Sequence, residues 1–159
     1  MLVICQSAKQ ATGAKESIIA QNETNDCFVY ALGTAFDMPY DEAHKIAAVK
    51  FDRNDRKGPK GSVINNVMTE MMNAKTSLNG KTVTEVMDRP TTQYKVYGEV
   101  VNRSLRVGSF ARKFNEGTYL ILIASHALTV KDGTIIDNKE NDPSVKGIVR
   151  KAYKIGEGQ

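Results

Sequence analysis

Cys27 is the residue whose place in the sequence most clearly allows nucleophilic chemistry. It opens a run, residues 27–36, in which apolar side chains recur at helical spacing after the polar pair Asn25-Asp26. At a helix start, a thiol meets backbone N–H groups without partners and the positive end of the helix dipole, and both favour the thiolate. We therefore predict that Cys27 is a nucleophile at the start of a buried helix.

His126 and Asp137 could supply a base and the group that orients it. They flank two β-rich runs joined by Asp132-Gly133, which is a strong signal for a two-residue hairpin turn. The start of the first strand and the end of the second lie side by side in such a hairpin, so the carboxylate can hold the imidazole. Asn138 is the neighbouring alternative. Strand alternation lets only one of the two face the histidine, and we favour Asp137.

Gln21 is a candidate for stabilising an oxyanion. It precedes Cys27 by six residues, and its side-chain amide could donate to the oxygen of an attacked carbonyl beside the Cys27 N–H. The second cysteine, Cys5, lies in a short apolar run and is interpreted as an inert small hydrophobe. The second histidine, His44, lies in a predicted helix and is interpreted as a solvated surface residue.

The order of these residues resembles that of the papain-like cysteine peptidase superfamily: glutamine, cysteine at a helix start, histidine at a strand start, then an acid or amide. The matching motifs are Gln21-Asn22-Glu23-Thr24-Asn25-Asp26-Cys27, Ser125-His126-Ala127-Leu128 and Ile136-Asp137-Asn138. Residues 117–137 are similar to the compact C-terminal half of small papain-like proteins of bacteriophages and bacteria. The chain departs from the pattern in carrying Phe28 where many papains have tryptophan, and in a shorter spacing from histidine to acid.

The resemblance implies a cysteine hydrolase that cleaves a peptide, isopeptide or related amide through Cys27, His126 and Asp137, with Gln21 at the oxyanion. The same residues could pass the acyl group to an amine instead of water. One alternative is a papain-fold binding module, such as a phage protein that binds and inactivates a host protein through a vestigial or capturing cysteine. Another is an amide hydrolase that acts on the cell wall. A peptide or protein substrate is expected, and neither a metal nor a cofactor is.

Apolar periodicity and turn signals predict an α+β fold in which N-terminal helices pack on a C-terminal antiparallel sheet. Helices are predicted over residues 27–36, 41–49, 63–74 and 109–115, and a short helix or strand over 82–88. Strands are predicted over residues 96–101, 118–123, 126–131, 134–137 and 149–155. The chain is expected to form one papain-like domain over residues 1–159. The unplaced middle segment, residues 50–110, is expected to build the wall of the substrate groove.

Composition narrows the class of protein. Of the 159 residues, 41% are hydrophobic and 25% charged, which is typical of a globular domain. Two cysteines are too few for a disulfide framework, and no signal-peptide or membrane-spanning pattern is visible, so we expect a cytoplasmic protein, in the host cytoplasm if phage-encoded. The net charge of +4 is modest, and the basic stretch 52–60 is interpreted as a solvated loop, so no nucleic-acid binding is expected. The oligomeric state is left open.

Overall fold

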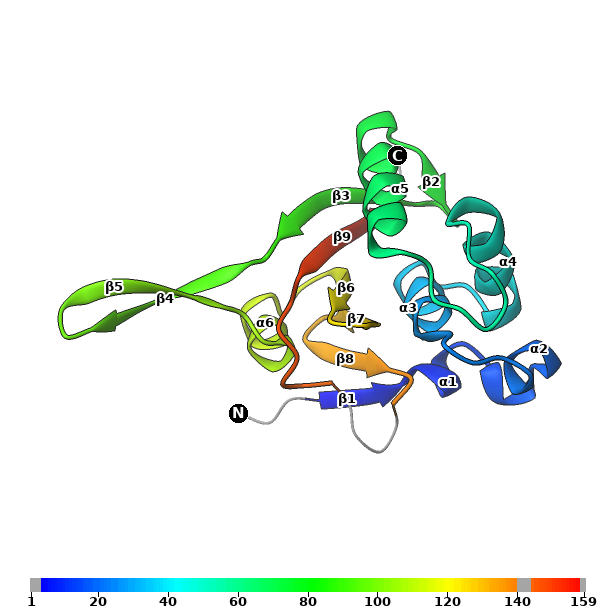
Figure 1. Cartoon of the computed structure of the whole chain (residues 1–159), viewed down its shortest axis with the longest axis horizontal. Coiled ribbons are helices and arrows are strands. Elements are labelled where there is room, and N and C mark those ends of the chain that lie inside the picture. Colours follow the sequence, from blue (N-terminus) through cyan, green and yellow to red (C-terminus); the bar gives the residue numbers. More distant parts are fainter. Residues whose placement is uncertain (1–3, 140–143, 158–159) are drawn as a thin grey trace.

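The α+β class predicted from the sequence is confirmed by the computed structural model, which describes residues 4–139 and 144–157 (Figure 1). Seven strands form one sheet in the order β1-β8-β7-β6-β9-β3-β2, and two further strands, β4 and β5, form a separate ribbon. Among the described residues, none of the helices combines the length and the apolar composition that a bilayer crossing requires.

After β1, the helices α1 to α5 come first, and the remaining strands follow with α6 between β5 and β6. The helices are α1 (Ala8–Ala11), the 3-10 turn η1 (Ala14–Glu16), α2 (Ile18–Gln21), α3 (Cys27–Ala35), α4 (Tyr40–Lys50), α5 (Gly61–Ala74) and α6 (Val107–Lys113). The strands are β1 (Ile4–Ser7), β2 (Ser77–Leu78), β3 (Lys81–Asp88), β4 (Thr91–Val96), β5 (Glu99–Ser104), β6 (Thr118–Ile123), β7 (His126–Lys131), β8 (Thr134–Asp137) and β9 (Lys151–Glu157).

The sheet is not confined to the C-terminal half, and it is not wholly antiparallel. Strand β1 pairs in parallel with β8, with Ile4 opposite Thr134, while β3 pairs antiparallel with β9. The expected C-terminal sheet therefore gains strands from the N-terminus and from the middle of the chain. Strand β8 is only four residues long, and without β1 it would leave an unpaired sheet edge.

Helix α3 is buried on all sides because nearly every residue in it is apolar or small. It packs on β7, where two buried hydroxyl groups join the elements. Thr34 Oγ1 donates to Thr129 Oγ1 at 2.7 Å, and Thr129 Oγ1 donates to the Ala31 carbonyl at 2.9 Å. These bonds fix the helix at a defined height along the strand.

Helix α6 covers the opposite face of the sheet. Its Phe110 packs edge-on against Tyr119 of β6, with ring centroids 5.1 Å apart. Successive strand residues alternate between the two faces, so that Leu120 joins the core beneath α3 while Ile121 joins the core beneath α6. The sheet is thus a layer between two sets of helices.

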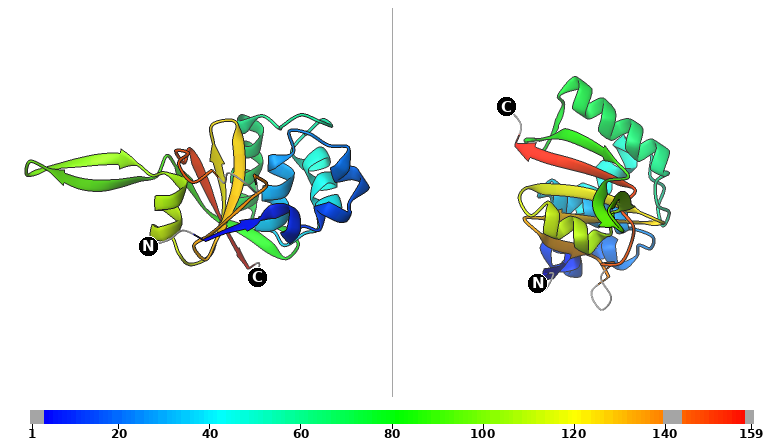
Figure 2. Two further views of the ribbon diagram at one scale, coloured as in Figure 1. Left: turned by 90° about the horizontal axis from the view of Figure 1, so that it is seen from below. Right: turned by 90° about the vertical axis from the view of Figure 1, so that its left-hand side faces the viewer.

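The middle segment, expected as one groove wall, divides into two parts with different surroundings. Residues 61–88 form α5, β2 and β3, which join the main body. Residues 91–104 form the β4–β5 ribbon, called the arm below, which extends away from the sheet and the helices (Figure 1 and the left view of Figure 2). The predicted strand 96–101 is wrong because Tyr97 and Gly98, with φ of 50° and 81°, form a turn in its middle.

Candidate functional site

Cys27 is the first residue of α3, as predicted, and it is half-buried. The preceding residue, Asp26, makes no side-chain hydrogen bond to the helix start, and its Oδ2 instead accepts a bond from Tyr40 Oη at 2.7 Å. The first intrahelical bond runs from the Tyr30 N–H to the Asp26 carbonyl. The N–H groups of Cys27 and Phe28 therefore have no intrahelical acceptor and can donate to a ligand.

His126 and Asp137 meet across the β7–β8 hairpin. His126 Nε2 lies 2.7 Å from Asp137 Oδ1, and both side chains are almost fully buried. A carboxylate only accepts hydrogen bonds, so Nε2 is the donor and Nδ1 is the nitrogen left for another partner. Asp137 also accepts bonds from the backbone N–H groups of Lys139 and Ser144, at 3.2 Å and 2.9 Å. The acid is thereby held on three sides.

Cys27 and His126 line the same pocket, and the thiol influences the charge state of the imidazole. Burial disfavours the charged imidazolium, but hydrogen bonds with Asp137 and Cys27 outweigh it and raise the pKa of His126 to about 9. Burial likewise acts to raise the pKa of Asp137, yet the bonds from His126 and from Ser144 N–H hold it below its ordinary value. The imidazole thus interacts with Asp137 through a hydrogen bond and lies beside Cys27 at the pocket.

The line opens into a pocket of about 800 Å³. Its walls come from the start of α3, the loop before α5 and the first turns of α5, and the strand ends of β3, β6 and β9 together with the start of β7. Of the middle segment, only residues near 58–65 and 88–89 reach the pocket. The lining residues are Asn25, Cys27, Phe28, Gly58, Pro59, Gly61, Ser62, Ile64, Asn65, Asp88, Arg89, Leu122, Ile123, Ser125, His126, Ala127, Arg150 and Lys151.

Gln21 does not line this pocket. It is an exposed residue at the end of α2, and it borders a separate hollow together with Tyr30 and Asn138. The position of Gln21 is set by the 3-10 turn η1 and the short helix α2, which together span residues 14–21. The polar sequence of this segment did not predict them. Of Asp137 and Asn138, only Asp137 contacts His126, and Asn138 borders the separate hollow. The donors at hand for an oxyanion are therefore the backbone N–H groups that begin α3.

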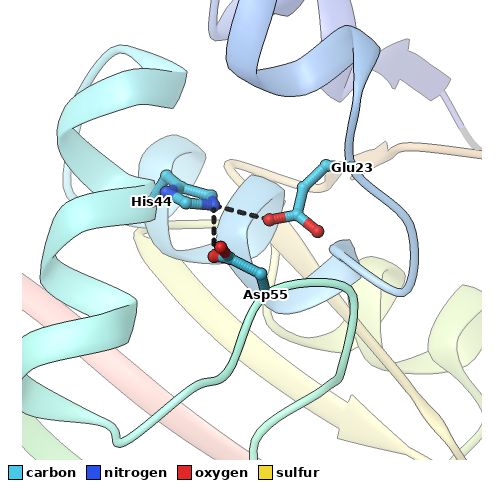
Figure 3. A group of neighbouring side chains, drawn as sticks. All are labelled: Glu23, His44 and Asp55. Atoms are coloured by element: carbon cyan, nitrogen blue, oxygen red, sulfur yellow. Dashed lines mark hydrogen bonds and ion pairs between the residues drawn. The ribbon is translucent and has the colours of Figure 1, made fainter.

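A second histidine–carboxylate pair lies between α2, α4 and the loop after α4 (Figure 3). His44 Nε2 is 2.5 Å from Glu23 Oε2 and 3.7 Å from Asp55 Oδ1. Glu23 also accepts a bond from Arg53 Nη1 at 2.9 Å, and the Arg53 side chain is only 1% exposed. The interpretations of His44 as a solvated residue and of residues 52–60 as a wholly solvated loop are therefore wrong.

The second pair serves to hold the chain together. Burial acts to raise the pKa of Glu23, but the bonds from Arg53, His44 and the Arg56 N–H outweigh it and lower this pKa to about 2. Glu23, His44 and Asp55 could bring three ligand atoms to one metal ion. The fixed charge of Arg53 already neutralises the only buried carboxylate among them, which opposes a cation there.

Cys5 differs from its sequence interpretation. It lies on β1 opposite Ile135 and its side chain is exposed. Partial burial and the nearby charge of Asp137 raise the pKa of its thiol. The chain therefore has two accessible thiols, and only Cys27 contacts an imidazole.

No protein-family model, no curated protein and no solved structure matches this chain.

Proposed function

We propose that this protein is a cysteine hydrolase with a papain-like arrangement of its catalytic groups, acting on a peptide, isopeptide or related amide bond. The observation that carries the proposal is that Cys27 and His126 line one pocket while Asp137 is hydrogen-bonded to His126 behind it. A nucleophile paired with a base, which is itself oriented by a third group, is the general requirement for acyl transfer by a side chain. No other cluster among the described residues brings a thiol and an imidazole together.

In the proposed reaction, Cys27 Sγ attacks the carbonyl carbon of the substrate. His126 Nδ1 takes the thiol proton and later gives it to the leaving amine, which departs as the thioester forms. Water, deprotonated by the same imidazole, then attacks the thioester and releases the acid and the free thiol. Asp137 holds the ring in the tautomer that keeps Nδ1 toward the sulfur.

The developing oxyanion would be stabilised by the N–H groups of Cys27 and Phe28 at the start of α3. These backbone donors take the oxyanion-stabilising role that the sequence suggested for Gln21, because the Gln21 side chain lies outside the pocket. An amine that enters in place of water would receive the acyl group, so transfer and hydrolysis use one set of residues.

A carbonyl-electrophile probe tests the proposal. The protein carries Cys5→Ser throughout, so that Cys27 is the only thiol, and labelling is followed by intact-mass spectrometry at pH 6. We expect rapid labelling that Cys27→Ala removes and His126→Ala slows by at least about 100-fold. The matched control is His44→Ala, which alters the other histidine. Equal labelling of the His126→Ala variant and its parent would contradict an activating role for the imidazole.

The arm favours a second candidate function, a binding module with a capturing or vestigial thiol. Tyr97 at its tip is fully exposed, and Tyr94, Val96, Val100 and Val101 are also exposed along its length. Such apolar exposure is typical of surfaces that contact another protein. Cleavage of a peptide library by the intact protein, lost in Cys27→Ala, would favour the hydrolase. Stoichiometric thioester capture without turnover would favour the binding module.

A further inference from the structure

The strand ends that wall the pocket place four residues in one row. His126 of β7 is opposite Ile123 of β6. The Arg150 N–H donates to the Leu122 carbonyl at 2.8 Å, and the Arg89 N–H donates to the Arg150 carbonyl at 2.8 Å. The register therefore continues as His126, Ile123, Arg150 and Arg89 across four neighbouring chain segments, and all four residues line the pocket.

Two cations in this row have no anionic partner among residues 4–139 and 144–157. The next row holds Asp88 and Lys151, which pair with each other at 3.3 Å. Among the described residues, neither Arg89 nor Arg150 forms an ion pair, although the two stand side by side. Both side chains are exposed, so water screens their mutual repulsion and both guanidinium groups can reach an anion in the pocket.

The backbone at Arg89 adds to this observation. Its φ of 47° lies in the left-handed region, which a long side chain rarely adopts. The residue occupies the junction between β3 and the arm, where the chain leaves the sheet. Conformations of this kind persist where the surrounding structure holds them, and they are common at ligand sites.

The other charged features of the pocket do not cancel the two arginines. The first turn of α5, from Gly61, faces the pocket without a side-chain cap, so the positive end of this 14-residue helix points the same way. The apolar part of the pocket lining, which includes Phe28, Ile64 and Leu122, can accommodate the rest of a peptide. The wall away from Cys27 is therefore positively charged, and the stretch between is largely apolar.

We infer that the substrate is an acidic polypeptide, bound extended across the strand ends, with a carboxylate held by Arg89 and Arg150. The inference rests on the proposed function and names the substrate class of the same pocket. Adjacent strands are about 4.8 Å apart, which puts Arg150 and Arg89 roughly 10 and 14 Å from His126 along the row. An extended chain advances about 3.3 Å per residue. The carboxylate is thus roughly three to four residues from the bond that is cleaved.

The test uses acetylated, amidated decapeptides in which Asp, Asn or Lys is scanned through every position, with cleavage sites read by mass spectrometry. We expect the Asp peptides to be cleaved with a kcat/KM about tenfold above their Asn counterparts at one position roughly three to four residues from the cleaved bond. Arg89→Gln with Arg150→Gln removes this preference. Arg150→Glu shifts it toward Lys. Arg112→Gln, which alters an exposed arginine outside the pocket, leaves it unchanged.

A binding readout separates this inference from the proposed function. Immobilised Cys27→Ala protein is exposed to the same library, and we expect Asp peptides to be retained about fivefold more strongly than Asn peptides, and not by the triple variant that also lacks both arginines. Acid-selective binding without any cleavage by the wild-type chain would overturn the hydrolase and keep the acidic ligand. If Asp and Asn peptides are cleaved at the same rate and retained equally, the acidic ligand is contradicted and the hydrolase stands. Thermal unfolding verifies that each variant is folded.

Discussion

The two histidines of the described chain each contact a carboxylate through Nε2, yet their surroundings give them different properties. His126 bonds to Asp137 at 2.7 Å and also touches a thiol beside an open pocket. His44 bonds to Glu23 at 2.5 Å, but Glu23 is shared with the buried guanidinium of Arg53. A histidine–carboxylate pair can act as a base when the second ring nitrogen faces a reactive atom. It also requires that no other cation is paired with the carboxylate.

Removing the first histidine should have the largest effect on the reaction. We expect His126→Ala to lower turnover of an amide substrate about 10²- to 10⁴-fold, because the thiol loses its proton acceptor. In contrast, His44→Ala should keep turnover within about twofold of the parent. Steady-state kinetics on both variants, normalised to folded protein, measures the difference. Comparable losses in the two variants would mean that the pairs are not distinct in function.

Breaking the second pair should act on stability instead. Glu23→Gln leaves the buried Arg53 without a counter-charge, which we expect to lower the free energy of unfolding by about 3 kcal/mol. Turnover per folded molecule should not change. Denaturant unfolding and active-site titration separate the two effects. The matched control is Asp55→Asn, which alters the exposed carboxylate of the same cluster and should cost little.

The pairs should also lose their stabilising effect at opposite ends of the pH scale. The pKa of His126 rises on folding to about 9, so its contribution is complete below about 6.5 and lost as the pH rises through 9. The pKa of Glu23 falls on folding to about 2, so its contribution is complete above about 4.5 and lost as the pH falls through 2. Melting temperatures of His126→Gln and Glu23→Gln are each compared with that of the parent from pH 2.5 to 10. The difference from the parent should shrink toward high pH for His126→Gln and toward low pH for Glu23→Gln.

The smallest expected effect sharpens the role of α3 in placing the thiol. Thr129→Val removes the hydroxyl that links β7 to the helix through Thr34 and the Ala31 carbonyl. We expect a loss of about 1 to 2 kcal/mol in the free energy of unfolding, since two buried polar groups lose a partner. A decrease in turnover should accompany it, because Cys27 and His126 lie on the two elements that this bond joins. Thr129→Ser, which keeps the hydroxyl, serves as the control.

The parts of the structure that local patterns determine are those that the sequence predicts well. The apolar spacing after Cys27 and the Asp132-Gly133 turn are local signals, and they place the thiol, the imidazole and Asp137 on the elements where they lie. Strand alternation also distinguishes Asp137 from Asn138. The position of Gln21 depends on short helices that begin with Ser7 and Ser17 caps, and the polar sequence there has no apolar period to reveal them.

Other features depend on contacts between distant segments. Arg53 looks like part of a charged loop, and only its contact with Glu23, thirty residues away, makes it a buried residue. The row that joins His126 to Arg150 and Arg89 requires the strand order and register, which alternation within one strand does not supply. The arm was missed because the apolar residues on both sides of Tyr97-Gly98 resemble a single strand.

The pairing of β1 with β8 affects the order in which the proposed catalytic groups come together as the protein folds. Ser7 is opposite Asp137, so the carboxylate that contacts the imidazole sits on a strand held from one side by a segment far earlier in the chain. A contact between segments so far apart forms slowly, because a long loop must close first. During translation, Cys27 is therefore made well before its proposed base, and the thiol has no imidazole partner until the β7–β8 hairpin has left the ribosome.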